Sequence, residues 1–276
     1  MEKPTFGTAD ELAVTWLGNA SVLVEIDHHW VLMDPIFGER PSPIAQVGPK
    51  RTHVSPVEVS GLPQLTAVVI SHDHYDHLDA PTIAAIVSLQ EVPFVVPLGV
   101  GSHLRRWGVP QNRIIERDWG GEVRMGSLTL TCTEARHFSG RWLARNKTLW
   151  SSWVLACDNG PRVFFGGDSG YTAAFSGLGT SYGPFDITMI PIGAYDRRWP
   201  DVHMTPEEAI ETHINLQGST MLPIHWLTWD LAFHSWDDPI ERAVIAAESR
   251  EVNIGLPRPG QRFDSGCVPT EKWWRA

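Results

Sequence analysis

Cysteine is scarce in this sequence. Only three occur among 276 residues, Cys132, Cys157 and Cys267. An odd number of widely spaced cysteines does not suggest the disulfide framework that holds many small secreted domains together. With 42% hydrophobic residues, the chain has enough apolar side chains to bury a core without such bridges. These features favour a reducing compartment, and we expect the protein to be cytoplasmic.

Positive charge is also limited. Lysine and arginine together number 22 against 32 acidic residues, which gives a formal net charge of -10. A nucleic-acid-binding protein would need a local basic stripe. The basic pairs Arg105-Arg106 and Arg197-Arg198 are too short to form one. We therefore expect no nucleic-acid partner.

Long apolar runs are absent as well. No run approaches the roughly 18 apolar residues of a membrane-spanning helix, and the first residues lack the basic and apolar regions of a signal peptide. The sequence predicts no transmembrane segment. Repeats, low-complexity tracts and long flexible linkers are absent too, so we expect residues 1–276 to form a single domain.

Short apolar or alternating runs between Gly, Pro, Asn and Asp residues indicate many β-strands. We predict strands at 12–17, 20–26, 29–33, 66–71, 93–97, 113–116, 121–125, 127–134, 147–157, 161–166, 186–192 and 219–224. Helical periodicity appears at about 80–89, 206–216 and 238–248, the second behind Thr205 as a possible N-cap. This order of elements is typical of an α/β fold. The Pro-rich stretch 35–63 is interpreted as a long loop, either one wall of a site or an ordinary surface excursion.

The most informative segment follows the predicted strand 66–71. It contains His72, His74, Asp76 and His77 in the pattern His-x-His-x-Asp-His. Histidines two residues apart in an extended segment point to the same side and can hold one metal ion. The chain turns after the strand, which would move Asp76 and His77 towards a second position. Imidazole and carboxylate ligands suit zinc, and also manganese or iron.

Four ligands do not satisfy two ions, so we expect more ligands later in the chain. Three candidates stand where predicted strands end, namely His137, Asp168 and His225. Two glycines precede Asp168 and would let the backbone approach closely there. Each candidate has the same local setting, an apolar run that ends in a ligand-type residue at a loop. We predict that all three are metal ligands.

These seven residues, in this order, resemble the metallo-β-lactamase superfamily of binuclear metallohydrolases. Within it, flanking stretches are similar to the N-acylphosphatidylethanolamine-hydrolysing phospholipase D group and its bacterial relatives. The stretches are WLGNASVLVEID, LMDPIFGERPSP, VGPKR, SHDHYDHLD, VPLGVGSHLRRWG, ARHFSGR, TLWSSWV, FFGGDSGY, GPFDITMIPIGAYDRRW, VHMTPEEA and IHW. The resemblance covers about residues 15–230, and the ligand pattern is its most specific part.

The resemblance implies a four-layer αβ/βα sandwich, the metallo-β-lactamase fold, with two divalent metal ions at the mouth between the sheet ends. Zinc is the first expectation, with manganese or iron as alternatives. Matching motif positions assigns the two ligand sets and a bridging residue: His72, His74 and His137 for one ion, Asp76, His77 and His225 for the other, and Asp168 between them. A hydroxide shared by the ions would be the nucleophile.

Other residues are assigned less directly. Asp34 and Asp79 are candidates to accept ligand-imidazole N–H bonds, or to serve ordinary turn or cap roles. His203 matches a histidine that lies near the substrate phosphate in the resembled group, and Tyr75 and Tyr195 are candidate hydroxyl donors there. The remaining histidines are expected on the surface or in packing. Trp199, Trp226 and Trp229 either line a pocket or pack in the core.

The resemblance and the expected small positive charge of the metal site favour a phosphodiesterase of phospholipase D type. Its substrate would be a small-molecule or lipid phosphodiester, and peripheral contact with a membrane is compatible with the sequence. A lactonase or other carbonyl-ester hydrolase would use the same metal site. A metal-binding scaffold without hydrolytic activity is the alternative from another class. The sequence makes no prediction about oligomeric state.

Overall fold

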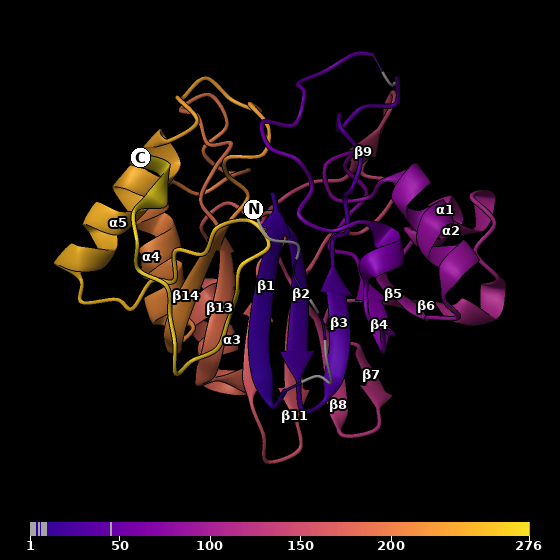
Figure 1. Cartoon of the computed structure of the whole chain (residues 1–276), viewed down its shortest axis with the longest axis horizontal. Coiled ribbons are helices and arrows are strands. Elements are labelled where there is room, and N and C mark those ends of the chain that lie inside the picture. The colour runs from indigo at the N-terminus through magenta and orange to yellow at the C-terminus, as the bar shows by residue number, and fades with distance from the viewer. Residues whose placement is uncertain (1–3, 5, 7–9, 45, 276) are drawn as a thin grey trace.

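Two mixed β-sheets form the centre of the molecule (Figure 1). A computed structural model of the chain describes residues 4, 6, 10–44 and 46–275. The first sheet has the strand order β15-β1-β2-β3-β4-β5-β6. Its strands are β1 (Leu12–Gly18), β2 (Ser21–Ile26), β3 (His29–Met33), β4 (Ala67–Val69), β5 (Phe94–Pro97), β6 (Ile114–Arg117) and β15 (Arg262–Phe263).

The second sheet has the order β14-β13-β12-β11-β8-β7. Its strands are β7 (Glu122–Met125), β8 (Leu128–Thr133), β11 (Ser152–Cys157), β12 (Arg162–Phe165), β13 (Phe185–Pro191) and β14 (Gly218–Ile224). A separate hairpin pairs β9 (Gly140–Arg141) with β10 (Ala144–Arg145). Strands β12, β13 and β14 are parallel, so their carboxyl ends lie at the same end of the sheet.

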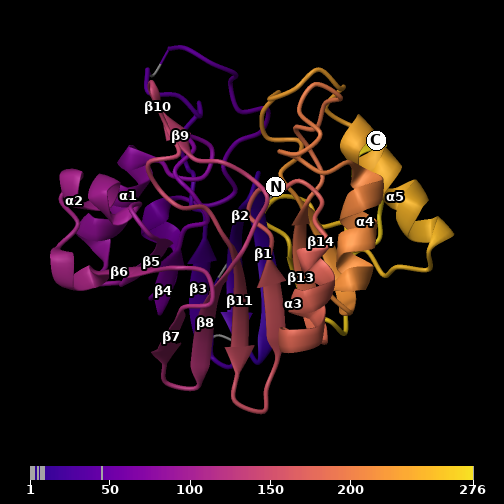
Figure 2. The same ribbon diagram turned by 180° about the vertical axis from the view of Figure 1, so that it is seen from behind.

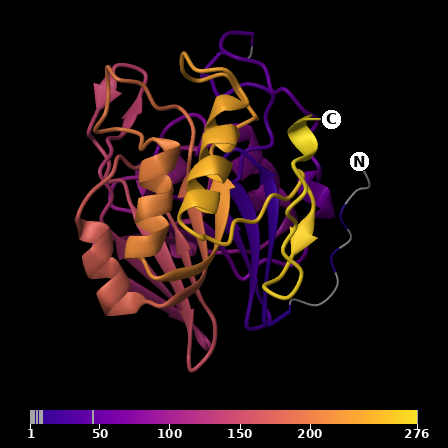
Figure 3. The same cartoon turned by 90° about the vertical axis from the view of Figure 1, so that its left-hand side faces the viewer.

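Helices cover the outer faces of both sheets. They are α1 (Ala80–Leu89), α2 (Gly101–Arg106), α3 (Ala174–Tyr182), α4 (Pro206–Asn215) and α5 (Asp238–Ser249). Figures 1 and 2 show α1 and α2 on one side of the strands and the other three on the opposite side. Figure 3 shows α3, α4 and α5 side by side. The chain therefore has the predicted four-layer αβ/βα sandwich, and among the described residues no helix is long and apolar enough to cross a membrane.

The alternation of side chains along β2 explains the two apolar layers. Val22, Val24 and Ile26 belong to the core between the sheets, whereas Leu23 belongs to the core beneath α1 and α2. Successive side chains of a strand point to opposite faces of its sheet, and here both faces are covered. This is why the strand is apolar throughout its length.

The predicted helices are confirmed, and their ends have identifiable caps. Asp79 accepts a hydrogen bond from the Thr82 amide (3.1 Å) at the start of α1. Thr205 begins α4 as predicted, in a reciprocal capping box with Glu208. Such caps satisfy amides that have no partner within the helix.

Some elements differ from their predictions. The expected strand 147–157 begins only at Ser152, because residues 146–150 connect the hairpin to the sheet. Helices α2 and α3 were not predicted. The first has only six residues, and the second is rich in Gly, Ser and Thr, which have low helix propensity. Packing against the sheets outweighs that propensity.

Several loops gather at the end of the molecule where the parallel strands finish. Figures 1 and 2 both place the long loop after β3, the β9–β10 hairpin and the segments after β13 and β14 there. The long loop from 34 to 58 has little regular structure, as expected from its prolines. The candidate ligands lie beneath these loops.

Candidate metal centre

The His-x-His-x-Asp-His motif begins just beyond β4 and is tied to its neighbours through Ser71. The Ser71 amide and hydroxyl both donate hydrogen bonds to Asp34, at 2.7 and 2.5 Å. The Ser71 carbonyl accepts from the amide of Ser151, which directly precedes β11 of the other sheet (2.9 Å). The start of the motif is therefore fixed relative to both sheets.

Three imidazoles converge in the first group. His74 Nδ1 lies 2.8 Å from His72 Nε2 and 3.2 Å from His137 Nε2. Two nitrogens bound to one tetrahedral zinc ion at its usual bond length lie about 3.3 Å apart. The His137 Nδ1–H donates to the Val202 carbonyl (2.9 Å), so its Nε2 lone pair is directed at the group.

The second group contains two imidazoles and two carboxylates. His225 Nε2 lies 3.0 Å from Asp76 Oδ2 and 3.3 Å from Asp168 Oδ1. His77 Nε2 lies 3.1 Å from Asp168 Oδ2 and 3.4 Å from Asp76 Oδ2. The four side chains could hold one metal ion. His225 directly follows β14 and has a φ of 61°, which turns the chain after the strand.

Asp168 belongs to both groups. Its Oδ2 lies 3.7 Å from His137 Nε2 and 3.9 Å from His72 Nε2, besides its contacts with the second group. Gly167 precedes it with a φ of 57°, and a Cβ there would lie 2.6 Å from Ser71 Cβ. Only glycine fits this close approach without strain. The structure thus brings all seven predicted ligands together in the two sets that the family resemblance implies.

The carboxylates of the cluster are held in their ionised form. Burial alone would raise the pKa of Asp76, but His77 and His225 bring it well below its ordinary value. Burial likewise opposes ionisation of Asp168, and His225 and His77 lower its pKa well below the usual range. Burial lowers the pKa of His72 well below its ordinary value, and the neighbouring His77 adds to this effect. His77 differs: burial opposes its charge, but Asp168 and Asp76 raise its pKa well above the ordinary value. Metals bind ionised carboxylates and neutral imidazoles, so metal binding would release the proton of His77.

The two aspartates considered for imidazole contacts have different roles. Asp34 Oδ2 accepts a hydrogen bond from His77 Nδ1 at 2.7 Å, so this prediction is confirmed. Asp79 instead caps α1, where its Oδ2 accepts from the amide and the hydroxyl of Thr82. Its alternative role as an ordinary cap is the one observed.

A cavity of about 360 Å³ opens over the cluster. It is lined by His74, Asp76, Phe138, Arg145, Asp168, Ala194, Trp199, Val202, His203, His225 and Leu231. Polar ligand residues form its base, and aromatic and aliphatic side chains form part of its wall. Trp199 is thus a pocket residue, whereas Trp226 stacks on Trp16 in the core with ring centroids 5.3 Å apart.

The three further candidates for catalysis lie in different surroundings. His203 Nδ1 lies 3.9 Å from Asp168 Oδ2 and has no hydrogen-bond partner, and burial lowers the pKa of His203 to about 4. The guanidinium of Arg141 packs 4.0 Å from the Tyr75 ring centroid. The Tyr195 hydroxyl donates to Asp238, outside the cluster. Of the three, His203 alone lines the cavity over the predicted ligands.

Five residues of this cavity were not predicted as site residues, namely Phe138, Arg145, Ala194, Val202 and Leu231, and the first two are in contact. Arg145 comes from strand β10, and Phe138 follows the ligand His137 directly. The Arg145 guanidinium lies 4.8 Å from the Phe138 ring centroid. The only available signal was the aromatic residue next to a candidate ligand, because the hairpin that carries Arg145 has no alternating apolar pattern.

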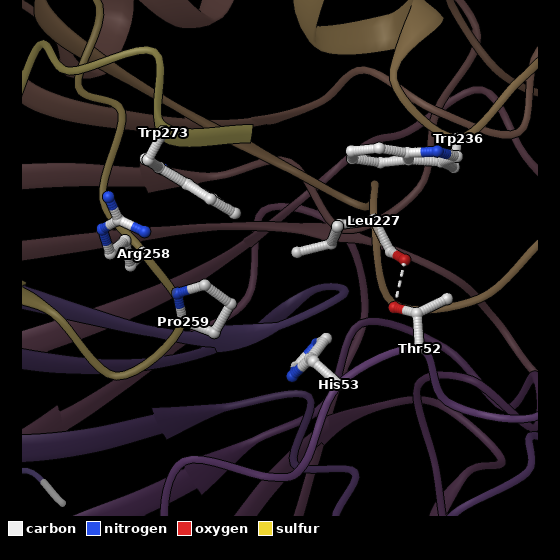
Figure 4. Close-up of a pocket in the computed structure, with 7 residues that line it drawn as sticks. All are labelled: Thr52, His53, Leu227, Trp236, Arg258, Pro259 and Trp273. Carbon is white, nitrogen blue, oxygen red and sulfur yellow. Dashed lines mark hydrogen bonds between the residues drawn. The ribbon is translucent and has the colours of Figure 1, made fainter. Parts of the chain in front are cut away.

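A second cavity, of about 370 Å³, adjoins Leu227, two residues after His225 (Figure 4). Figure 4 shows Leu227, Trp236 and Trp273 around it, and the Thr52 hydroxyl donates to the Leu227 carbonyl (2.7 Å). Its lining is mainly apolar, and no metal-binding group found among the described residues includes any of its lining residues. Among the described residues, the predicted metal ligands therefore adjoin the first cavity and not this one.

Comparison with known proteins identifies the family. A family model described as the beta-lactamase superfamily domain matches residues 29–226, which contain all seven predicted ligands. The chain belongs to the metallo-β-lactamase superfamily. The fold and the family relationship predicted from the motifs are confirmed, and the His/Asp cluster is consistent with the metal-dependent hydrolases of this superfamily.

Relatives narrow the relationship within the superfamily. The chain is 52% identical over 273 residues to the protein Rv0906 of Mycobacterium tuberculosis, covering 98% of this chain and 73% of that protein. It is 37% identical over 238 residues to N-acyl-phosphatidylethanolamine-hydrolyzing phospholipase D 1 of Caenorhabditis elegans, covering 82% and 67%. A solved structure, the metallo hydrolase Igni18 of Ignicoccus hospitalis, superposes with a TM-score of 0.69 at 20% identity, covering 92% of this chain and 98% of that one. This last likeness concerns the fold.

Proposed function

We propose that the protein is a metal-dependent phosphodiesterase of phospholipase D type that acts on a small-molecule or lipid phosphodiester. The observation that carries the proposal is the pair of ligand groups sharing Asp168 at the base of an open cavity. Two divalent ions, zinc first and manganese or iron as alternatives, would occupy these groups. The relationship to a nematode enzyme named for hydrolysing N-acyl-phosphatidylethanolamine supports the substrate class.

The chemistry of the donor set fits two metal ions. His77 Nε2 and Asp168 Oδ1 are buried without a hydrogen-bond partner, although burying an unsatisfied polar atom is unfavourable. Cations at these positions would satisfy both atoms. When bound, such a pair of ions activates water as a nucleophile and neutralises charge on the phosphate and the leaving oxygen.

The residues of the chain would hold and orient the reacting groups. Asp34 fixes the ring of His77 through the bond to Nδ1, and the Val202 carbonyl does the same for His137. His203 presents an unpartnered Nδ1 to the cavity, so its imidazole would hydrogen-bond to the substrate phosphate. Tyr75 and Tyr195 have no comparable access, and their proposed donor roles are secondary.

The test is a panel of substrates with protein that has been depleted of metal and reloaded. Hydrolysis of bis(4-nitrophenyl) phosphate and of a phospholipid in mixed micelles should require added Zn²⁺, Mn²⁺ or Fe²⁺. Asp168→Ala should lower kcat/KM by about a hundredfold or more, because several kcal/mol of transition-state stabilisation is lost. Asp118→Asn changes an exposed aspartate outside the cluster and should leave the rate unchanged.

Two outcomes would overturn the proposal. Activity confined to a lactone or thioester in the same panel would identify a carbonyl-ester hydrolase. Binding of metal without turnover of any substrate would indicate a scaffold. Elemental analysis of gently purified protein distinguishes the second outcome from simple loss of metal.

Peripheral contact with a lipid surface is part of the proposal for a lipid substrate. Three segments expose large apolar side chains at the end of the molecule that carries the site. They contain Ile44 and Val47, Trp142 and Leu143, and Phe233 and Trp236. Figures 1 and 2 show the loops that carry them around this end. Exposed apolar residues near a site are typical of interaction surfaces.

The double variant Trp142→Ser/Leu143→Ser tests this contact. It should reduce flotation with phosphatidylcholine vesicles while leaving hydrolysis of bis(4-nitrophenyl) phosphate unchanged. Leu89→Ser/Ile245→Ser removes two exposed apolar residues from α1 and α5 and serves as the matched control. Equal flotation of all three proteins would contradict the proposed contact.

We also propose a cytoplasmic location. Cys132 and Cys157 are buried and unpaired, and burial raises the pKa of each thiol to about 12. These properties suit a reducing compartment, where free thiols persist. Immunofluorescence or fractionation of the expressed protein would test the location.

A further inference from the structure

Arg145 occupies an unusual position at the mouth of the metal-site cavity. It is the only lysine or arginine among the described residues that line this cavity. Its guanidinium lies against Phe138, whose ring contacts the rings of His74 and His137, with centroids 4.5 and 4.9 Å away. The arginine is thus one aromatic ring away from two predicted metal ligands.

The hairpin that carries Arg145 is tied to the metal-binding motif. Arg141 donates hydrogen bonds from its Nη1 to the Asp73 carbonyl (2.8 Å) and the Leu78 carbonyl (2.7 Å). The Gly140 amide donates to Asp73 Oδ1 at 2.6 Å. Strand β10 pairs with β9, with Arg145 opposite Gly140. The backbone of Arg145 is therefore held in place relative to the cluster.

The charge of Arg145 is not neutralised within the protein. In the part of the chain that the structure describes, no carboxylate forms an ion pair with it, although acidic residues outnumber basic ones by 32 to 22. Some other arginines are paired, for example Arg198 with Asp196 (2.6 Å) and Arg136 with Asp201 (2.6 Å). Arg145 is exposed to solvent, and its unpaired guanidinium is available to an anion that enters the cavity.

The reacting phosphate is not a sufficient partner for this arginine. In the proposed function that phosphate binds at the cluster, whereas the Arg145 guanidinium packs on the Phe138 ring beside the cluster. The group that we assign to Arg145 extends away from the cluster, along the cavity wall. A guanidinium binds carboxylate or phosphate in a bidentate manner.

We propose that Arg145 is a specificity-determining residue that selects phosphodiesters carrying a second anionic group, a carboxylate or a phosphomonoester, on the arm that extends towards the β9–β10 hairpin. This inference rests on the proposed phosphodiesterase function and deepens it. The metal cluster acts on the diester, and Arg145 binds the second anion. The residue contributes to substrate binding rather than to the bond-breaking step, so we expect its loss to raise KM and to leave kcat nearly unchanged.

The experiment uses three 4-nitrophenyl phosphodiesters that differ only in a short second alcohol, which ends in a carboxylate, a phosphomonoester or a hydroxyl. Arg145→Ala should raise KM about tenfold for one or both anionic arms and change kcat by less than about twofold, as expected for loss of one charge-assisted contact. The hydroxyl arm should be unaffected. Arg145→Lys should retain part of the wild-type preference for the anionic arms. Arg145→Glu should raise KM for the anionic arms above that of the hydroxyl arm.

Lys147→Ala is the matched control, because it removes a positive charge two residues away that does not line the cavity. An equal change for all three arms in Arg145→Ala would overturn the proposal and indicate general support of the site by the hairpin. Equal kinetics of Arg145→Ala and the wild type would overturn it as well. The two anionic arms show which anion the residue binds.

A binding measurement separates this proposal from the proposed function. Calorimetric titration of metal-loaded protein with ω-carboxyalkylphosphonates of two to six carbons, against the corresponding alkylphosphonates, requires no turnover. The carboxylate should tighten binding about tenfold at one chain length in the wild type and not in Arg145→Ala. Absence of that gain at every length would contradict the role of Arg145. Failure of all diesters to be hydrolysed would instead contradict the proposed function.

Discussion

Asp34 supports the metal-binding motif without having a free oxygen for an ion of its own. Its two oxygens accept hydrogen bonds from the amide and hydroxyl of Ser71 and from the His77 ring. Burial raises the pKa of Asp34, so these bonds help to keep it ionised. Asp34, His72 and His77 form a third group of potential ligands, but these hydrogen bonds favour an orienting role. Such outer contacts fix the ring and the tautomer of a ligand.

Asp34→Asn should therefore weaken metal binding about tenfold to a hundredfold while preserving the fold. The position has a φ of 37°, which asparagine tolerates better than most residues. The measurement is zinc affinity by competition with a chelator. Asp79→Asn keeps a good helix cap and should bind zinc like the wild type. Equal losses in both variants would show that Asp34 has no special role.

His213 is a buried histidine outside the site. It lies on α4, where its Nδ1 is 2.7 Å from the Thr188 hydroxyl of β13. Burial lowers its pKa to about 4 from the ordinary value of 6.5. The unfolded chain therefore binds a proton at this residue at a higher pH than the folded protein does. The stability conferred by the neutral ring is present above pH 6.5 and is lost as the pH falls towards 4.

We expect this residue to reduce the free energy of unfolding by about 3 kcal/mol between pH 6.5 and 4, at 1.36 kcal/mol per pKa unit. Urea unfolding at several pH values should show a steeper loss for the wild type than for His213→Gln. His29→Gln replaces a partly exposed histidine and should retain the wild-type dependence. Parallel curves for wild type and His213→Gln would contradict the prediction.

At the scale of elements, α3 and α4 approach each other closely at Gly179. A Cβ on this residue would lie 2.2 Å from the Asn215 carbonyl oxygen, at the end of α4. Gly177 lies in the same helix, and a Cβ there would meet no atom within 4 Å. The two glycines therefore differ in packing but share the same secondary structure.

Substitution by alanine should have opposite effects at these two positions. Gly179→Ala forces backbone apart and should lower the free energy of unfolding by about 1–3 kcal/mol. Gly177→Ala should raise it by up to about 1 kcal/mol, because alanine is the better helix former. Thermal unfolding of both variants beside the wild type measures the difference. A stabilised Gly179→Ala would show that the helices can separate freely.

Elements with a clear pattern were predictable, and the others depend on tertiary contacts. Helix α4 has an N-cap, a proline in its first turn and a helical apolar period, so its start is encoded locally. Helix α3 contains two glycines, one of which, Gly179, lies where α4 approaches, and these glycines make its sequence a poor helix by local rules. The β9–β10 hairpin is held by Arg141 on backbone carbonyls of the motif, a contact that no local pattern reveals.

At the scale of the whole molecule, the ligands could be predicted as a set because each ends a strand or follows one closely. The ends of β4 and β14, in different sheets, bring His72 and His225 to the same cluster. Their distances and the orienting bond of Asp34 required the coordinates. Arg145 could not be predicted, since its importance comes from the cavity that it faces. The single-domain organisation of 1–276 stays a prediction.

Metal binding should stabilise the whole fold, because the two ligand groups join residues from both sheets at one end of the molecule. The apolar core between the sheets contains none of the predicted ligands, so the metal-free protein should still fold. Ions that bind only the folded state at a thousand times their Kd add about 4 kcal/mol. For a chain of this size that corresponds to a rise in Tm of roughly 8–16 °C.

Thermal unfolding with EDTA and with added Zn²⁺ measures this rise in Tm. Asp168→Ala should lose most of the rise, and His103→Gln, which changes a histidine outside the groups, should keep it; a Tm that does not respond to metal would remove the physical basis of the proposed site.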